Sequence, residues 1–110
     1  MSEIINYEQF SQMDMRVGKV ISAEKVENTD KLLKVMIDLG EEIPRQLVAG
    51  IAQQYTPEQL VGRDMVVLTN LEPRTIRGVE SRGMILAATV EGAPVILTTE
   101  KPVPVGSKIK

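Results

Sequence analysis

Residues 31–39 place apolar and polar side chains on opposite sides of the chain, and this pattern limits the fold more than any other feature of the sequence. Four apolar residues fall at every second position: Leu33, Val35, Ile37 and Leu39. Lys34 and Asp38 belong to the other face. A period of two is typical of a β-strand with one buried face, so the segment predicts a strand.

Further strands are predicted where β-branched or apolar residues concentrate, in segments 16–26, 45–49, 65–69, 84–90 and 95–98. The first of these segments is long and contains Gly18, which allows a bulge or a bend within a strand. Segment 65–69 is almost entirely apolar, as expected of a strand that is covered on both faces. Residues 91–94 predict a turn, and two prolines exclude the tail from a central strand.

Two short helices are predicted by similar signals at their N-termini. Asn6 can cap the first helix, with Gln9 three residues later. Thr56 and Gln59 repeat this spacing, and Pro57 falls at the first position of the second helix.

The resulting order is helix, three strands, helix, two strands and a smaller β-appendage. This order is that of an OB-fold. We therefore expect an all-β protein: a five-stranded OB-fold barrel with a short helix between strands three and four, an N-terminal helical turn and a C-terminal β-appendage. A small β-sandwich is the alternative. The length of 110 residues, without an internal repeat or a linker, predicts a single domain over residues 1–110.

The chain lacks two residue types on which many enzymes and metal sites depend, because it contains no cysteine and no histidine. Disulfides, zinc sites with these ligands, Cys–His nucleophiles and Ser–His triads are therefore excluded within this chain. We expect no metal, no cofactor and no enzymatic activity. No apolar run approaches the roughly 18 residues of a membrane span, and the N-terminus is unlike a signal peptide. A cytoplasmic location without a membrane partner is the resulting expectation.

The connection over residues 70–84 concentrates positive charge in a chain whose formal net charge is −2. Its three arginines are Arg74, Arg77 and Arg82. Guanidinium groups form bidentate hydrogen bonds with phosphate, and a local excess of charge decides the field that a partner meets within about 8–10 Å. The alternative is a solvated loop whose arginines pair with Glu72 and Glu80.

Several further residues of the sequence allow both a binding and a structural interpretation. Ser81 and Met84 flank the dipeptide Arg82–Gly83 and offer a hydroxyl and a thioether. The alternative places Ser81 in a turn and Met84 in the core. Asn70 either contacts a ligand or caps a turn. The aromatic residues are few: Tyr7, Phe10 and Tyr55. We therefore expect any nucleic acid to be recognised by its backbone and shape and not by stacked bases.

Five sequence segments, taken together, resemble one family. They are FSQMDMRVGKV at 10–20, DKLLKVMIDLG at 30–40, RQLVAGIAQQYTPEQLVG at 45–62, NLEPRTIRGVESRGMILAA at 70–88 and VPVGSKIK at 103–110. The sequence is similar to the tRNA-binding domain family. Its members include the C-terminal domains of many methionyl-tRNA synthetases, free-standing tRNA-binding proteins and domains appended to tyrosyl-tRNA synthetases.

The resemblance implies an OB-fold that binds tRNA by its shape, at the outer corner of the L, without reading the anticodon. It implies a homodimer that is paired with help from the C-terminal appendage, and an association with methionyl-tRNA synthetase as a domain, a subunit or a free-standing protein. Carried over position by position, it assigns tRNA contacts to Asn70, Arg74, Arg77, Ser81, Met84, Lys31 and Arg45. The alternative is a polypeptide-binding protein, because an export-related chaperone family shares this fold and part of these motifs.

Overall fold

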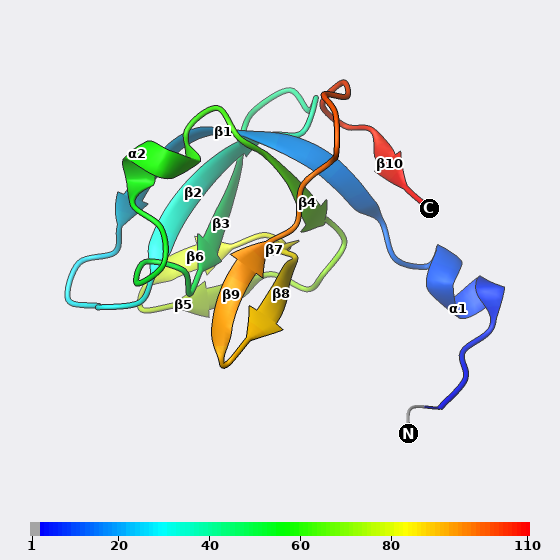
Figure 1. Cartoon of the computed structure of the whole chain (residues 1–110), viewed down its shortest axis with the longest axis horizontal. Helices are drawn as coiled ribbons and strands as arrows, with labels where there is room; N and C mark the ends of the chain where they lie inside the picture. The colour runs from blue at the N-terminus through cyan, green and yellow to red at the C-terminus, as the bar shows by residue number, and fades with distance from the viewer. Residues whose placement is uncertain (1–2) are drawn as a thin grey trace.

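A computed structural model of the chain describes residues 3–110 and shows a small antiparallel barrel with two hairpins and a short N-terminal helix attached to it (Figure 1). The barrel strands are β1 (Met15–Lys25), β2 (Leu33–Asp38), β3 (Arg45–Ala49), β4 (Asp64–Leu68) and β7 (Met84–Ile85). They follow the order β3–β2–β1–β4–β7 in the sheet. The expected all-β class and OB-type barrel are confirmed.

The core is built from the strand faces that the alternation predicts. The fully buried side chains include Leu33, Val35, Ile37, Leu47, Leu60, Met65 and Val67. Three of these residues are the alternate positions of β2, and two come from β4, whose central residues are buried on both faces as expected.

The long first strand serves three partners, because β1 pairs with β2, with β4 and with the short β10 (Lys108–Ile109). The register with β2 shifts between Val20 and Ser22, so the irregularity lies beyond Gly18 and not at it. A Cβ atom at Gly18 would lie 2.3 Å from Cγ2 of Ile37. The glycine therefore leaves room for the Ile37 side chain and permits the close approach of β1 to β2.

Both helices begin with the predicted caps. α1 (Tyr7–Ser11) starts after Asn6, whose side chain accepts a hydrogen bond from the backbone N–H of Gln9, and the Gln9 side chain accepts one in return. α2 (Pro57–Leu60) has the same reciprocal arrangement after its N-cap residue. Figure 1 shows α2 packed at one end of the barrel, where Leu60 is buried, and α1 projecting away from the barrel.

The predicted strand over residues 84–90 is wrong as a single element. The structure divides it into β7, which pairs with β4, and β8 (Ala87–Val90), which pairs with β9 (Ala93–Ile96). The change of partner occurs at Leu86, whose N–H donates to Val66 and whose carbonyl accepts from Leu97. The β8–β9 hairpin is the expected C-terminal β-appendage.

The turn-rich connection over residues 70–84 contains a second hairpin, which the sequence did not predict. It consists of β5 (Arg74–Ile76) and β6 (Val79–Ser81), in which Ile76 faces Val79. Arg77 and Gly78 form the turn with φ angles of 53° and 80°. Positive φ at both central residues is the geometry of a type I′ turn, which matches the twist of a two-stranded hairpin. No helix within residues 3–110 is long and apolar enough to span a membrane.

Candidate nucleic-acid interface

The β5–β6 hairpin carries two arginines whose guanidinium groups face solvent. Arg74 starts β5 and Arg77 occupies the turn, and both residues are exposed. Among residues 3–110, neither side chain forms an ion pair or a hydrogen bond. The side chain of Arg82, after the hairpin, is 60% exposed, and its ion pair with Glu80 is long, at 3.8 Å. The alternative of a loop neutralised by its own glutamates therefore applies to Arg82 alone.

The tip of the hairpin lies beside the loop that joins β1 to β2. Arg77 lines one shallow depression with Lys31 and Asn28, and a second one with Lys25 and Lys34. Residues that are far apart in the sequence therefore bring several cations to one edge of the barrel. Acidic residues also line these depressions, and Lys34 forms an ion pair with Glu24.

Asn70 ties the start of the connection to the N-terminal segment. Its side-chain carbonyl accepts a hydrogen bond from the backbone N–H of Asp14 at 2.9 Å, and its amide group donates to the carbonyl of Gln12 at 2.6 Å. The hydroxyl of the neighbouring Thr69 donates to the carbonyl of Asp14. Both functional groups of the Asn70 side chain are thus used within the chain, in contacts with the N-terminal segment and not in a turn cap.

Ser81 is buried, with 5% of its surface exposed. Its hydroxyl accepts a hydrogen bond from the backbone N–H of Val48 at 3.0 Å and donates to the carbonyl of Gly83 at 3.1 Å. Gly83 has a φ of 151°, and a Cβ atom there would lie 2.9 Å from the carbonyl oxygen of Leu68. Ser81 and Gly83 therefore attach the end of the hairpin to β3 and β4.

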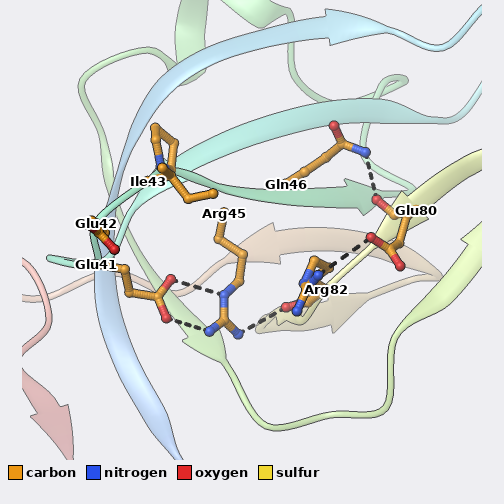
Figure 2. Close-up of a pocket in the computed structure, with 8 residues that line it drawn as sticks. Glu41, Glu42, Ile43, Arg45, Gln46, Glu80 and Arg82 are labelled. Carbon is orange, nitrogen blue, oxygen red and sulfur yellow. Dashed lines mark hydrogen bonds and ion pairs between the residues drawn. The ribbon is translucent and has the colours of Figure 1, made fainter.

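Arg45 is largely covered and is held by Glu41 through a bidentate ion pair, as Figure 2 shows. A third nitrogen of its guanidinium donates to the backbone carbonyls of Thr69 and Arg82. Met84, by contrast, is 44% exposed on β7 and does not lie in the core.

Among residues 3–110, the carboxylates near these side chains do not form a metal site. Within the described range 3–110, no group of three or more acidic residues lies close enough to hold a metal ion. The depression in Figure 2 has a volume of about 440 Å³, is open to solvent, and is lined by Glu41, Glu42, Ile43, Pro44, Arg45, Gln46, Glu80 and Arg82. The arrangement offers charged contacts to a polyanion.

The family of the chain follows from comparison with known proteins. Residues 15–108 match the family model described as "Putative tRNA binding domain". The chain belongs to the tRNA-binding domain family. The domain that it matches is the non-catalytic tRNA-binding domain of methionyl-tRNA synthetases.

Similar proteins include methionine–tRNA ligases of archaea and bacteria. The chain is 54% identical over 106 residues to the ligase of Methanocella arvoryzae, and the match covers 96% of this chain and 15% of the ligase. It is 48% identical over 107 residues to the ligase of Caldanaerobacter subterraneus, with 97% of this chain and 17% of the ligase covered. The chain thus spans less than one fifth of the length of these relatives.

Two solved structures share the fold of this tRNA-binding domain over nearly its whole length. A MetRS related protein from Pyrococcus horikoshii superposes with a TM-score of 0.92 at 37% identity, and the match covers 99% of this chain and 100% of the other. The chaperone CsaA from Bacillus anthracis superposes with a TM-score of 0.88 at 31% identity, covering 98% and 100%. The fold alone therefore does not separate the two functions that the sequence left open.

Sequence reasoning missed three features of this interface. It overlooked Lys25, which lies in the β1–β2 edge beside Arg77, and Glu41, which holds Arg45. It also overlooked the hairpin, although the sequence Arg-Thr-Ile-Arg-Gly-Val-Glu-Ser places two short β-type segments on either side of a two-residue turn that ends in glycine. That signal was present, as was the four-residue spacing of Glu41 and Arg45, whereas the position of Lys25 beside Arg77 depends on residues distant in the sequence.

Proposed function

We propose that this domain binds tRNA by its shape, through the sugar–phosphate backbone, with Arg74 and Arg77 of the β5–β6 hairpin as the main contacts. The observation that carries the proposal is that both guanidinium groups are exposed and form no ion pair with any residue in the range 3–110. A guanidinium without an internal partner can form bidentate hydrogen bonds with phosphate oxygens. We include Lys31, which lines a depression with Arg77, and the exposed Met84 in the proposed contact surface.

Three of the residues assigned by the resemblance have a different role in this proposal. Asn70, Ser81 and Arg45 direct their polar groups into the chain. We propose that they hold the connection in place, and that the exposed residues contact the RNA.

The aromatic residues support recognition of backbone and shape. The rings of Tyr7 and Phe10 lie 6.3 Å apart on the projecting helix α1, and the hydroxyl of Tyr55 accepts a hydrogen bond from Ile96. None of the three belongs to the hairpin, so no stacking platform for bases adjoins Arg74 and Arg77. Phosphate contacts fix the position of a protein on RNA without reading its sequence.

We further propose that the domain acts as a homodimer in association with methionyl-tRNA synthetase. The β8–β9 hairpin and the segment after it expose Val90, Val95 and Leu97 by 54%, 47% and 43%. Burying these side chains against a second copy would remove apolar area from water. Two copies of the arginine-bearing hairpin on one particle would increase avidity for tRNA without new contacts.

The salt dependence of tRNA binding tests the proposed role of the arginines. Affinity is measured by gel-shift titration at several salt concentrations for the wild type and for the double variant Arg74→Ala with Arg77→Asn. Each phosphate contact that is lost should reduce the slope of log affinity against log salt by about 0.7–0.9. Arg63→Asn removes an exposed arginine at the opposite end of β4 and is the control for the loss of a cation outside the hairpin. A double variant with the slope of the wild type would exclude these residues as phosphate contacts.

The second candidate function is the binding of unfolded polypeptide, which the likeness to the chaperone CsaA favours. Such a function would use exposed apolar side chains and not the arginines. Filter-binding competition between tRNA and an unfolded polypeptide separates the two functions. Retention of the polypeptide, which added tRNA does not displace, without any retention of tRNA would support the second.

A further inference from the structure

The guanidinium of Arg45 contacts both ends of the connection that carries the hairpin. Its Nη1 donates to the carbonyl of Thr69, directly after β4, at 2.5 Å. The same nitrogen donates to the carbonyl of Arg82, directly after β6, at 3.1 Å. The β5–β6 hairpin leaves the barrel between these two carbonyls, so one side chain joins the two points where it starts and ends.

Glu41 fixes the orientation of that guanidinium. Its two carboxylate oxygens accept hydrogen bonds from Nε and Nη2 of Arg45 at 3.2 and 2.5 Å (Figure 2). A bidentate pair of this kind sets the plane of the guanidinium as well as its position. Together with the bonds to the two carbonyls, four of the N–H donors are engaged within the chain. The Arg45 side chain is only 20% exposed.

Strand β3 also attaches the second end of the hairpin through its backbone and through Gln46. The side-chain amide of Gln46 donates to the carbonyl of Glu80 at 2.8 Å, and the backbone carbonyl of Gln46 accepts from the backbone N–H of Arg82 at 3.0 Å. These bonds hold residues that follow the hairpin turn. The hydrogen bond from Arg45 to Thr69 holds the first end of the connection as well. It therefore restrains the direction in which the hairpin leaves the barrel.

We propose that Arg45, oriented by Glu41, is a positioning residue: it sets the direction of the hairpin that carries Arg74 and Arg77, and it does not itself contact phosphate. This inference rests on the proposed tRNA binding. A hairpin held in its bound orientation loses less conformational freedom when it binds, which increases affinity. The carboxylate of Glu41 would therefore favour the binding of a polyanion, although its own charge repels one.

The two roles of Arg45 predict effects of opposite sign for the variant Glu41→Gln. If Arg45 contacted phosphate, removing the carboxylate would release its guanidinium and increase tRNA affinity. If Arg45 positions the hairpin, the same variant should decrease affinity by about three- to tenfold, a modest coupling for residues in one network. Glu42→Gln is the matched control, because Glu42 lines the same depression and, within residues 3–110, has no ion pair or side-chain hydrogen bond.

The experiment is a set of tRNA gel-shift titrations with the full chain at fixed salt. We expect Glu42→Gln to bind as tightly as the wild type or slightly more tightly, and Glu41→Gln to bind more weakly. An affinity of Glu41→Gln equal to or above that of Glu42→Gln overturns the inference. If the wild type itself does not retard tRNA, the proposed function fails, which is a different result.

A double-mutant cycle separates positioning from a general loss of structure. In the background of Arg74→Ala with Arg77→Asn, the hairpin no longer carries the contacts that Arg45 would position. Glu41→Gln should therefore change affinity by less than about twofold in that background. A full effect there would show that Glu41 and Arg45 act independently of the hairpin, and would overturn the inference.

A second variant and a second measurement do not depend on Glu41→Gln being well folded. Arg45→Lys keeps the charge but loses the planar fork, so it should weaken binding about as much as Glu41→Gln. A lysine variant with wild-type affinity would contradict the positioning role. Without tRNA, amide hydrogen exchange in β5 and β6 should be faster in Arg45→Lys and in Glu41→Gln than in Glu42→Gln. Equal exchange rates in the three variants would also contradict it.

Discussion

The barrel and the β5–β6 hairpin use their side chains in opposite ways. The barrel strands turn Leu33, Ile37 and Met65 into a core from which solvent is excluded. Within the hairpin, Ser81 is buried, whereas Arg74 and Arg77 face solvent. The barrel therefore provides the stability, and the hairpin carries the exposed arginines that we propose as tRNA contacts. Because the two regions join at residues 69 and 82–83, stability and tRNA affinity should be separable everywhere except at that junction.

The largest expected effect on stability is that of a cavity in the barrel. Leu33→Ala removes a side chain that is fully buried on β2 and should lower the free energy of unfolding by about 2–5 kcal/mol. Urea denaturation measures the change. The fraction of protein that remains folded should bind tRNA as the wild type does. A stable variant with lost affinity would show that the core and the hairpin are coupled.

The next largest effect is expected where the hairpin joins the barrel, because stability and tRNA affinity should change together there. Gly83→Ala introduces a Cβ atom 2.9 Å from the carbonyl oxygen of Leu68 and 3.0 Å from Cδ2 of Leu47, at a φ of 151°. Overpacking of this kind should cost about 1–3 kcal/mol of stability. Because Gly83 directly follows the segment that β3 holds, tRNA affinity should fall as well. Urea denaturation and gel-shift titration of the same preparation measure both.

Gly78→Ala provides the contrast for that variant. Gly78 also has a positive φ, of 80°, but no atom of residues 3–110 lies within 4 Å of an added Cβ atom, so the substitution strains the turn without disturbing the barrel. A Gly83→Ala protein with full tRNA affinity would mean that tRNA binding tolerates a displacement of the point where the hairpin joins the barrel.

The sequence predicted those parts of the fold whose causes are local. The two capping boxes lie within four consecutive residues each, at Asn6 and Thr56, and both are present. The alternation that ends at Leu39 assigned the buried face of β2 correctly. In each case, the residues that form the feature are neighbours in the chain, so their pattern alone determines the structure.

The remaining features depend on partners that the sequence does not identify. Whether Arg45 points to solvent or to the carbonyl of Arg82, 37 residues away, depends on how the barrel closes. Asn70 likewise meets its partners 56 and 58 residues away. The break at Leu86 arises because β7 and β8 pair with different strands. The candidate site was therefore located from the sequence as a segment, but its residues could not be sorted into exposed and structural ones.

A smaller effect on stability and a clear effect on binding are expected from Arg77→Asn. Asn-Gly is the preferred pair in a type I′ turn, so the variant should change the free energy of unfolding by less than about 0.5 kcal/mol. The loss of one cation should reduce the salt slope of tRNA binding by about 0.7–0.9. Salt-dependent titration and urea denaturation check the two expectations. A destabilised variant with an unchanged slope would reverse the roles that we assign to the two regions.

The smallest effect is expected for the ion pair between Glu24 of β1 and Lys34 of β2. The two residues face each other across the strands, and their side chains are 65% and 31% exposed. Exposed pairs of this kind contribute about 0.2–1 kcal/mol, so Glu24→Gln should change stability only slightly.

Glu24 and Lys34 also line the depression beside Arg77, and Lys34 without its partner would become available to phosphate. We therefore expect tRNA affinity to rise by up to about twofold at low salt and to approach that of the wild type at high salt, where such charges are screened. A decrease in affinity would show that the proposed contact surface ends at the hairpin and does not extend across the β1–β2 edge.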